Sequence, residues 1–258
     1  MKGKAVMHPK AHRMRRIFKS DGRTLVVAMD HAGFMGPVAG LIDPVATVNA
    51  VVAGGADAVM TTLGTAKKIS EALQGRGLIL SVDLHAPDPA AVVENAIAIG
   101  ADSLKTLAFW GADDPVGMHN LGRYGVLCDR WGLPFQAEMI PFSFAATDKH
   151  TPENIAIAAR IGAECGADYV KVQYTGDPDS FRRVVEGAGV PVIILGGARS
   201  ERPVATQVAD AIRAGGAGIA FGRNIWSTPD PEAAARSFVE AIHGADSRMS
   251  RAPQAVRA

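Results

Sequence analysis

The chain alternates short, apolar, β-rich runs with longer Ala-rich segments of helical period, and this alternation occurs eight times. Such an alternation predicts successive βα units built around a parallel sheet. The predicted strands cover residues 25–30, 58–62, 78–85, 103–109, 135–140, 169–174, 192–195 and 218–221. Predicted helices between them include residues 43–53, 89–99, 152–164, 180–186, 203–214 and 231–242.

A weak internal repeat indicates how these units are arranged. Gly-Ala-Asp at 55–57, 100–102 and 166–168, and Gly-Ala-Gly at 216–218, each end a predicted helix before an even-numbered strand. An even and odd alternation over eight units fits a (β/α)8 TIM barrel, whose interior layers come from alternate strands. No Gly-x-Gly-x-x-Gly turn follows the first strand, which disfavours a dinucleotide-binding sheet. We therefore expect one α/β barrel domain over residues 1–244, including a short basic N-terminal helix, and a flexible tail over 245–258.

Composition limits the partners of this barrel. The 258 residues carry 27 Lys+Arg against 26 Asp+Glu, so no broad charged surface is predicted for nucleic acid or a membrane. No apolar run approaches the roughly 20 residues of a membrane span. Cys128 and Cys165 form no CxxC motif, which favours a reducing cytoplasm over a disulfide framework. The expected partners are a small-molecule substrate and, in a homo-oligomer, further copies of the chain.

The sixth strand carries the clearest chemical signal. Val170 and Val172 suit its helix-facing side, which turns Lys171 into the barrel. Burying an ammonium is costly, so burial favours the neutral amine, which attacks carbonyl carbons to form a Schiff base. The structural alternative is a strand-end lysine that reaches water or forms an ion pair.

Three further ionisable residues are predicted on the same inner surface. Lys105 shares its face with Leu107, and it either supplies a like charge, binds a substrate oxygen or neutralises a carboxylate. Glu138 is inward by the same parity, and it either shuttles a proton or only pairs with Lys105. Asp30 ends the first strand, where it either hydrogen-bonds the nucleophile or a substrate hydroxyl or is a loop carboxylate.

The third strand adds Asp83 and His85 on one face, and His31 follows Asp30. We expect these three residues to line the substrate cavity. Drawn as a metal site, they match no specific ligand spacing, so neither a metal nor another cofactor is predicted.

Two loops have the composition of phosphate sites. Gly196, Gly197 and Arg199 follow the seventh strand, and Gly222 and Arg223 follow the eighth. Glycines let backbone N–H groups approach an anion, and Arg offers paired donors. Phosphate sites recur at these two loops of TIM barrels, although ordinary tight βα turns also contain glycine.

With these residues identified, the chain resembles the class I aldolases of the DeoC/LacD/FbaB group over roughly residues 13 to 243. The resemblance is carried by Val27-Ala28-Met29-Asp30-His31, Tyr169-Val170-Lys171-Val172-Gln173-Tyr174-Thr175-Gly176-Asp177, Ile194-Leu195-Gly196-Gly197 and Gly222-Arg223-Asn224-Ile225-Trp226. It implies that Lys171 is the Schiff-base lysine, that Asp30 assists it, and that the two glycine loops hold a substrate phosphate.

Strand five departs from one branch of this group. Archaeal-type fructose-bisphosphate aldolases carry Trp-Met-Tyr-Pro there, and this chain has Glu138-Met139-Ile140-Pro141, without the tyrosine acid or base. Lys105 and Glu138 instead look like the strand-four Lys and strand-five Glu of tagatose-bisphosphate and sulfofructose-phosphate aldolases. The expected activity is reversible aldol cleavage of a phosphorylated ketose or related oxo-sugar. The alternatives are a metal-dependent aldolase using His31, Asp83 or His85, and a non-catalytic sugar-phosphate sensor.

Overall fold

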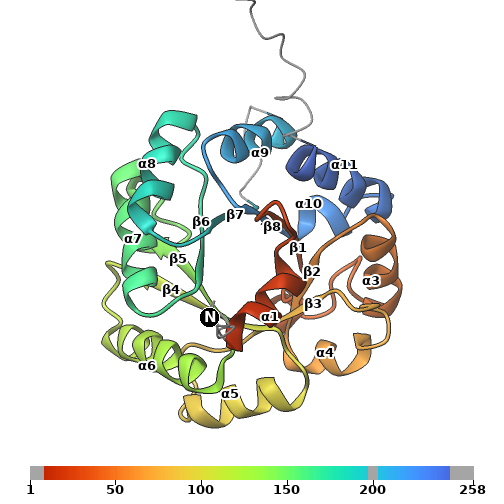
Figure 1. Ribbon diagram of the computed structural model, residues 1–258, viewed down its shortest axis with the longest axis horizontal. Helices are drawn as coiled ribbons and strands as arrows, with labels where there is room; N and C mark the ends of the chain where they lie inside the picture. The colour runs from red at the N-terminus through yellow and green to blue at the C-terminus, as the bar shows by residue number, and fades with distance from the viewer. Residues whose placement is uncertain (1–8, 197–202, 245–258) are drawn as a thin grey trace, which may run out of the picture.

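The computed structural model describes residues 9–196 and 203–244. Its eight strands pair in parallel, in sequence order, and β8 pairs back to β1, so the sheet closes into a barrel inside a ring of helices (Figure 1). This confirms the predicted (β/α)8 fold, while the expected tail lies outside the described ranges. The strands are β1 (Thr24–Ala28), β2 (Ala58–Thr61), β3 (Gly77–Ser81), β4 (Ser103–Trp110), β5 (Phe135–Pro141), β6 (Tyr169–Val172), β7 (Val192–Leu195) and β8 (Gly218–Phe221).

Most helices have a start signal that can be read in the sequence. Six of them begin at a proline, which needs no intrahelical N–H partner, after an Asp or Thr whose side chain accepts a backbone N–H of the first turn. These six are α3 (Pro44–Ala53), α5 (Pro89–Ala98), α6 (Pro115–Trp131), α7 (Pro152–Glu164), α8 (Pro178–Ala188) and α11 (Pro231–His243). The others are α1 (Pro9–Ile17), α2 (Ala32–Met35), α4 (Leu63–Ile69), α9 (Val204–Arg213), α10 (Arg223–Trp226) and a 3-10 turn, η1 (Thr147–Lys149).

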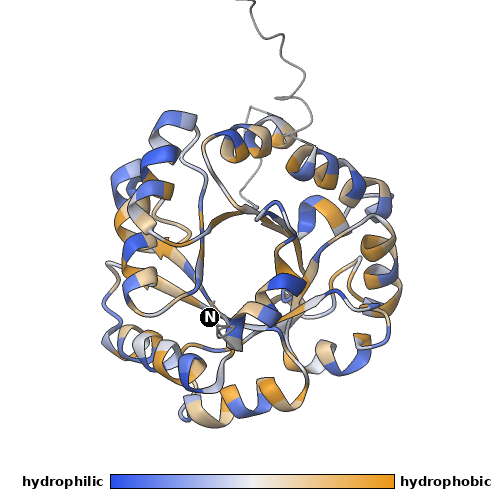
Figure 2. Cartoon of the chain, viewed as in Figure 1, coloured by the Kyte–Doolittle hydropathy of each residue, from blue (hydrophilic) through white to orange (hydrophobic). Residues whose placement is uncertain are grey.

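Two apolar clusters hold these layers together. The larger joins the outer face of the strands to the inner faces of the helices, whose outer faces are hydrophilic (Figure 2). The smaller fills the barrel interior at the end where the strands begin. There, Ile17 and Phe18 at the end of α1 pack with inward residues such as Val26, Ile79 and Tyr169. Helix α1 therefore closes the end of the barrel at which the strands begin. No helix in the described ranges is long and apolar enough to cross a membrane.

The repeated Gly-Ala-Asp tripeptide acts at this closed end. Asp57, Asp102 and Asp168 each accept a backbone N–H at or beside the start of the preceding strand, at 2.7 to 3.0 Å. Each also pairs with a base on or just after α1, in the pairs Lys19–Asp57 (3.4 Å), Arg16–Asp102 (3.1 Å) and Lys10–Asp168 (2.8 Å). The basic N-terminal segment is thus bound to three alternate βα units.

The fourth copy of the repeat has Gly218 in place of the aspartate. Its φ of +131° favours glycine, and a Cβ there would lie 2.0 Å from the carbonyl oxygen of Thr24. Thr24 and Gly218 are register partners where β1 meets β8. Glycine is required at this position because the two backbones approach so closely as the barrel closes.

Candidate active site

Four strands bring two lysines and two carboxylates together inside the barrel. Lys105, Glu138 and Lys171 project inward from β4, β5 and β6, and Asp30 follows β1. Glu138 and Lys171 are register partners, which places their side chains side by side. All four residues are at most 8% exposed. The parity that the sequence predicts for the three strand residues is the one the structure has.

Glu138 lies at the centre of this group. Its Oε1 is 2.8 Å from Lys171 Nζ and its Oε2 is 2.7 Å from Lys105 Nζ. Lys105 Nζ is also 3.3 Å from Asp30 Oδ2, which accepts a hydrogen bond of 2.8 Å from Ser81 Oγ. Two ammonium groups thus face two carboxylates, and the buried cluster is neutral as a whole.

These contacts determine how the groups titrate. Burial alone raises the pKa of both carboxyls, but the positive charges of Lys105 and Lys171 outweigh it. They lower the pKa of Asp30 to about 2 and also lower that of Glu138. Burial disfavours the charge of Lys105, yet Glu138 and Asp30 raise its pKa. Lys105 is therefore a fixed cation at neutral pH, and a fixed cation is a poor nucleophile.

The cluster forms the floor of a cavity of about 460 Å³. This cavity contains eight residues that the sequence singles out: Asp30, His31, Lys105, Glu138, Lys171, Gly196, Gly222 and Arg223. Burial lowers the pKa of the His31 imidazole, with Asp30 opposing this, so the ring is neutral at pH 7. Gly197 and Arg199 lie outside the described residues.

The prediction that Asp83 and His85 line the substrate cavity is wrong, because neither residue lines it. Strand β3 ends at Ser81, so strand parity no longer applies two residues later. Both residues are exposed, and His85 Nε2 is 2.8 Å from Asp114 Oδ2, the residue that caps α6. This hydrogen bond raises the pKa of His85. The His85 side chain therefore contacts the start of α6, and Asp83 Oδ1 accepts the backbone N–H of His85 at 2.9 Å. The described residues also contain no group of three or more His, Cys, Asp or Glu placed to hold a metal ion.

The cavity walls at β7 and β8 contain two glycines, one of which packs closely against the end of β1. Gly196 and Gly222 both line the cavity, and Arg223 begins the short helix α10 beside them. A Cβ on Gly222 would lie 2.5 Å from His31 Cε1 and 2.7 Å from the carbonyl oxygen of Ala28. Trp226 Nε1 donates to that same carbonyl at 2.9 Å and so attaches α10 to β1.

Several residues in or beside the cavity are not predicted from the sequence. Ser81 is the register partner of Lys105, and its contact with Asp30 could have been predicted once β3 and β4 were paired. Gln173 lines the cavity, and the parity of strand residues places it on the inward face of Lys171. His150 comes from the loop between β5 and α7, and no local pattern marks it.

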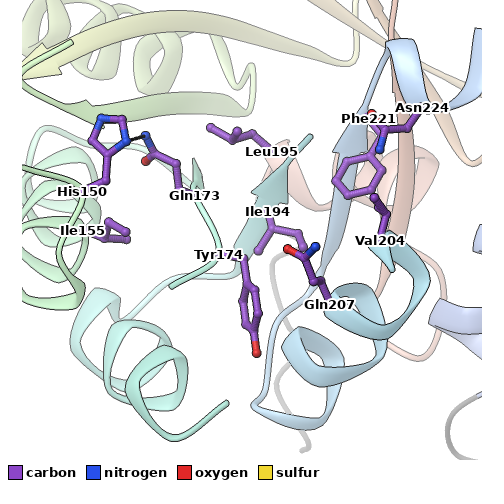
Figure 3. A pocket seen from close by; sticks show the side chains of 10 residues that line it. All are labelled: His150, Ile155, Gln173, Tyr174, Ile194, Leu195, Val204, Gln207, Phe221 and Asn224. Carbon is purple, nitrogen blue, oxygen red and sulfur yellow. Dashed lines mark hydrogen bonds between the residues drawn. The ribbon is translucent and has the colours of Figure 1, made fainter. Parts of the chain in front are cut away.

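His150 and Gln173 form a hydrogen bond beside a second, smaller cavity of about 230 Å³ between β6, β7 and β8 (Figure 3). His150 Nε2 is 2.8 Å from the carbonyl oxygen of Ser143, so this nitrogen carries the hydrogen. His150 Nδ1 then accepts from the amide of Gln173 at 3.5 Å. Because His150, Gln173, Leu195 and Asn224 line both cavities, the smaller one is a side branch of the larger.

A buried amine beside a carboxylate inside a parallel barrel is the arrangement that Schiff-base chemistry on a carbonyl substrate requires, as in the class I aldolases. The chain belongs to the DeoC/LacD family of aldolases, whose family model matches residues 24–228. It is accordingly an enzyme of the lyase class.

Two curated relatives and one solved structure extend this comparison. A 2-amino-3,7-dideoxy-D-threo-hept-6-ulosonate synthase from Halobacterium salinarum is 33% identical over 244 residues, 91% of each chain. A 2-amino-4,5-dihydroxy-6-oxo-7-(phosphonooxy)heptanoate synthase from Streptomyces griseus is 30% identical over 257 residues, 93% of each chain. The structure of an archaeal fructose-1,6-bisphosphate aldolase, with its catalytic Lys bound to a carbinolamine intermediate, superposes with a TM-score of 0.78. It is 29% identical, and the match covers 91% of this chain and all of that one.

Proposed function

We propose that the protein makes and cleaves a carbon–carbon bond next to the carbonyl of a phosphorylated ketose or related oxo-sugar, through a Schiff base on Lys171. One observation carries the proposal, namely the contact of 2.8 Å between Lys171 Nζ and Glu138 in a cavity walled by Gly196, Gly222 and Arg223. The relatives named as synthases support the bond-forming direction in addition to cleavage.

The contacts suggest the order of proton transfers. Glu138 is the nearest base to Lys171, and it accepts the proton that leaves the amine. Once Lys171 is neutral, Lys105 is the remaining one of the two cations that keep Glu138 ionised. Glu138 therefore holds the proton until it transfers it to the hydroxyl that leaves as water. The neutral amine then attacks the ketone, and loss of water leaves an iminium that withdraws electrons from the adjacent carbon.

In the cleavage direction, the hydroxyl of the bond to be broken gives its proton to Glu138, and the bonding electrons move into the iminium to form an enamine. Lys105 keeps its positive charge beside Glu138 and Asp30, so its role is to stabilise negative charge. Ile140 is fully buried and has no ionisable group, which leaves Glu138 as the ionisable residue of β5 in the cavity. This Lys105–Glu138 pair supports the tagatose-bisphosphate and sulfofructose-phosphate type of arrangement.

Phosphate binding supplies the orientation. Gly196, Gly222 and Arg223 lie at the ends of β7 and β8, at the same rim of the barrel as the lysine. Binding energy from the phosphate therefore holds the reacting carbons over Lys171 without contributing to the bond change itself.

The test is borohydride reduction in the presence of dihydroxyacetone phosphate or fructose 1,6-bisphosphate, read by intact mass and peptide mapping. We expect one adduct, on Lys171. The Lys171→Met variant, which has similar volume and no charge, should stay folded and lose both adduct and turnover. Lys105→Met is the matched control, and it should lower the rate but still form some adduct.

Other outcomes would change the assignment. An adduct on Lys105 would exchange the roles of the two lysines. Turnover without any adduct would refute the Schiff base, and loss of that turnover with a chelator would identify a metal-dependent aldolase. Binding without adduct or turnover would identify a sugar-phosphate sensor.

A further inference from the structure

The β4 side of the active cavity, opposite Gly222 and Arg223, is lined by apolar side chains, and the loop after β5 adds Phe144 together with Thr147 and His150. In a closed barrel of eight strands in sequence order, β4 lies across from β8. Beyond Lys105, alternate residues place Leu107 and Phe109 on the inner side of β4, and Leu107 lines the cavity. Phe109 packs edge-to-face against Phe144, with the ring centroids 5.5 Å apart, and Phe144 also lines the cavity.

Apolar side chains also form the rim of the cavity. Phe34 and Met35 on α2, which follows β1, are 72% and 49% exposed, and Phe144, which follows β5, is 52% exposed. Strands β1 and β5 face each other across the barrel, so these side chains stand on opposite sides of the mouth. Exposed large apolar groups that surround a concave site mark a binding surface, because water solvates them poorly.

The Lys and Arg side chains of the cavity lie away from these apolar groups. Among the described lining residues, the Lys and Arg side chains are Lys105, Lys171 and Arg223. The two lysines are paired with Glu138 and Asp30 on the floor, and Arg223 stands beside Gly222. On the β4 and β5 side, the described lining residues therefore include no Lys or Arg other than the paired Lys105. Lys149, in the loop after β5, is not among them and lies 3.3 Å from Asp148 Oδ2.

We infer that the substrate end remote from the phosphate is apolar, so that the aldehyde partner carries an alkyl or aromatic group. This inference rests on the proposed function. With the ketone carbon on Lys171 and its phosphate at β7 and β8, the aldehyde approaches from the remaining side, where Leu107 and Phe144 lie. Its carbonyl oxygen meets Glu138, and its substituent extends between Phe144 and Phe34.

The experiment measures kcat/KM for bond formation between dihydroxyacetone phosphate and a series of aldehydes. The series is propanal, butanal, pentanal, hexanal and phenylacetaldehyde, with glyceraldehyde and glyceraldehyde 3-phosphate as polar and charged comparisons. We expect kcat/KM to rise roughly two- to fourfold with each added methylene, as for partial to full burial of that group. Hexanal and phenylacetaldehyde should exceed glyceraldehyde 3-phosphate.

Variants locate the effect. Phe144→Ala should lower kcat/KM for hexanal about tenfold and that for glyceraldehyde less than about twofold, and Phe144→Leu should keep most of the preference. Trp131→Ala is the matched control, because Trp131 is a 45% exposed aromatic residue at the end of α6 that does not line this cavity. It should leave the aldehyde series unchanged.

A flat series, a preference for glyceraldehyde 3-phosphate, or an equal effect of Phe144→Ala on all aldehydes would overturn the inference. So would a change in assembly mass without a change in aldehyde preference, since Phe144 would then be a subunit contact. The borohydride adduct with dihydroxyacetone phosphate separates the two levels. If the adduct forms but kcat/KM does not vary along the aldehyde series, only the inference of an apolar aldehyde is overturned. If no adduct forms, the proposed function is overturned as well.

Discussion

Glu138 determines the charge balance of the site, because its two oxygens contact the two lysines separately. Either lysine alone leaves one carboxylate oxygen without a cation, and both together keep the carboxyl ionised when no substrate is bound. The same contacts support the different roles that we propose for Lys105 and Lys171. Lys105 also contacts Asp30, and its charge is stabilised by two carboxylates.

At this residue we expect Glu138→Gln to lower kcat roughly 10²- to 10⁴-fold, because the shape is kept and the proton acceptor is lost. The borohydride adduct on Lys171 should still form, more slowly. Steady-state kinetics and trapping on the same preparation make the measurement. An unchanged kcat together with a lower melting temperature would show that Glu138 only neutralises Lys105.

At the scale of elements, the four-residue helix α10 presents Arg223 to the cavity, and the hydrogen bond from Trp226 to β1 holds it there. Losing one charged hydrogen bond to phosphate corresponds to about 1.5–3 kcal/mol, or roughly 10- to 150-fold. Arg223→Ala should therefore raise KM by this factor for a phosphorylated substrate, and change the unphosphorylated analogue much less. Equal effects on both substrates would remove Arg223 from the phosphate site.

Helix α1 is the second element with a testable role. Lys10 is 3% exposed and pairs with Asp168, which also accepts the N–H of Phe135, and with Asp129. Lys10→Met should lower the free energy of unfolding by about 1–3 kcal/mol, measured by urea denaturation, with little change in kcat. The control Arg236→Met breaks an exposed pair with Glu232 and should cost about 0–1 kcal/mol. Similar losses in both variants would show that α1 does not stabilise the barrel through Lys10.

At the scale of the whole molecule, His243 joins the last helix to the first units of the barrel. Its Nδ1 is 2.7 Å from Asp21 Oδ2 and its Nε2 is 2.9 Å from Asp57 Oδ2. Both nitrogens donate only in the imidazolium form, and the hydrogen bond to Asp57, followed by that to Asp21, raises the pKa of His243 against the effect of burial.

Because the folded pKa of His243 is raised, its stabilisation is complete below the unfolded value of about 6.5 and is lost as pH rises through the folded value. His243→Gln should therefore lower the melting temperature clearly at pH 6 and little at pH 9. The control is the same substitution at exposed His119 on α6, which should leave the melting temperature at pH 6 close to that of the wild type. A difference in melting temperature between wild type and His243→Gln that grows with pH would contradict this assignment.

The expected homo-oligomer stays a prediction, which sedimentation of the full chain checks.

The sequence by itself determined the barrel and the inward face of three strands. The alternation of eight units sets the fold class, and a period of two places Lys105, Glu138 and Lys171 inward, because strand parity is a local property of the backbone. The same rule failed for Asp83 and His85. Strand β3 ends at Ser81, where its pairing with β4 stops, and that end depends on the neighbouring strand.

Only the tertiary structure decided which side chains meet. The two contacts of Glu138 join strands that are far apart in the chain, so their lengths depend on barrel closure. His150 and Phe144 reach the cavity from an irregular loop, whose path depends on long-range contacts that leave no periodic signal. The aspartates of the Gly-Ala-Asp repeat acquired their partners in the same way, when α1 folded across the opening of the barrel.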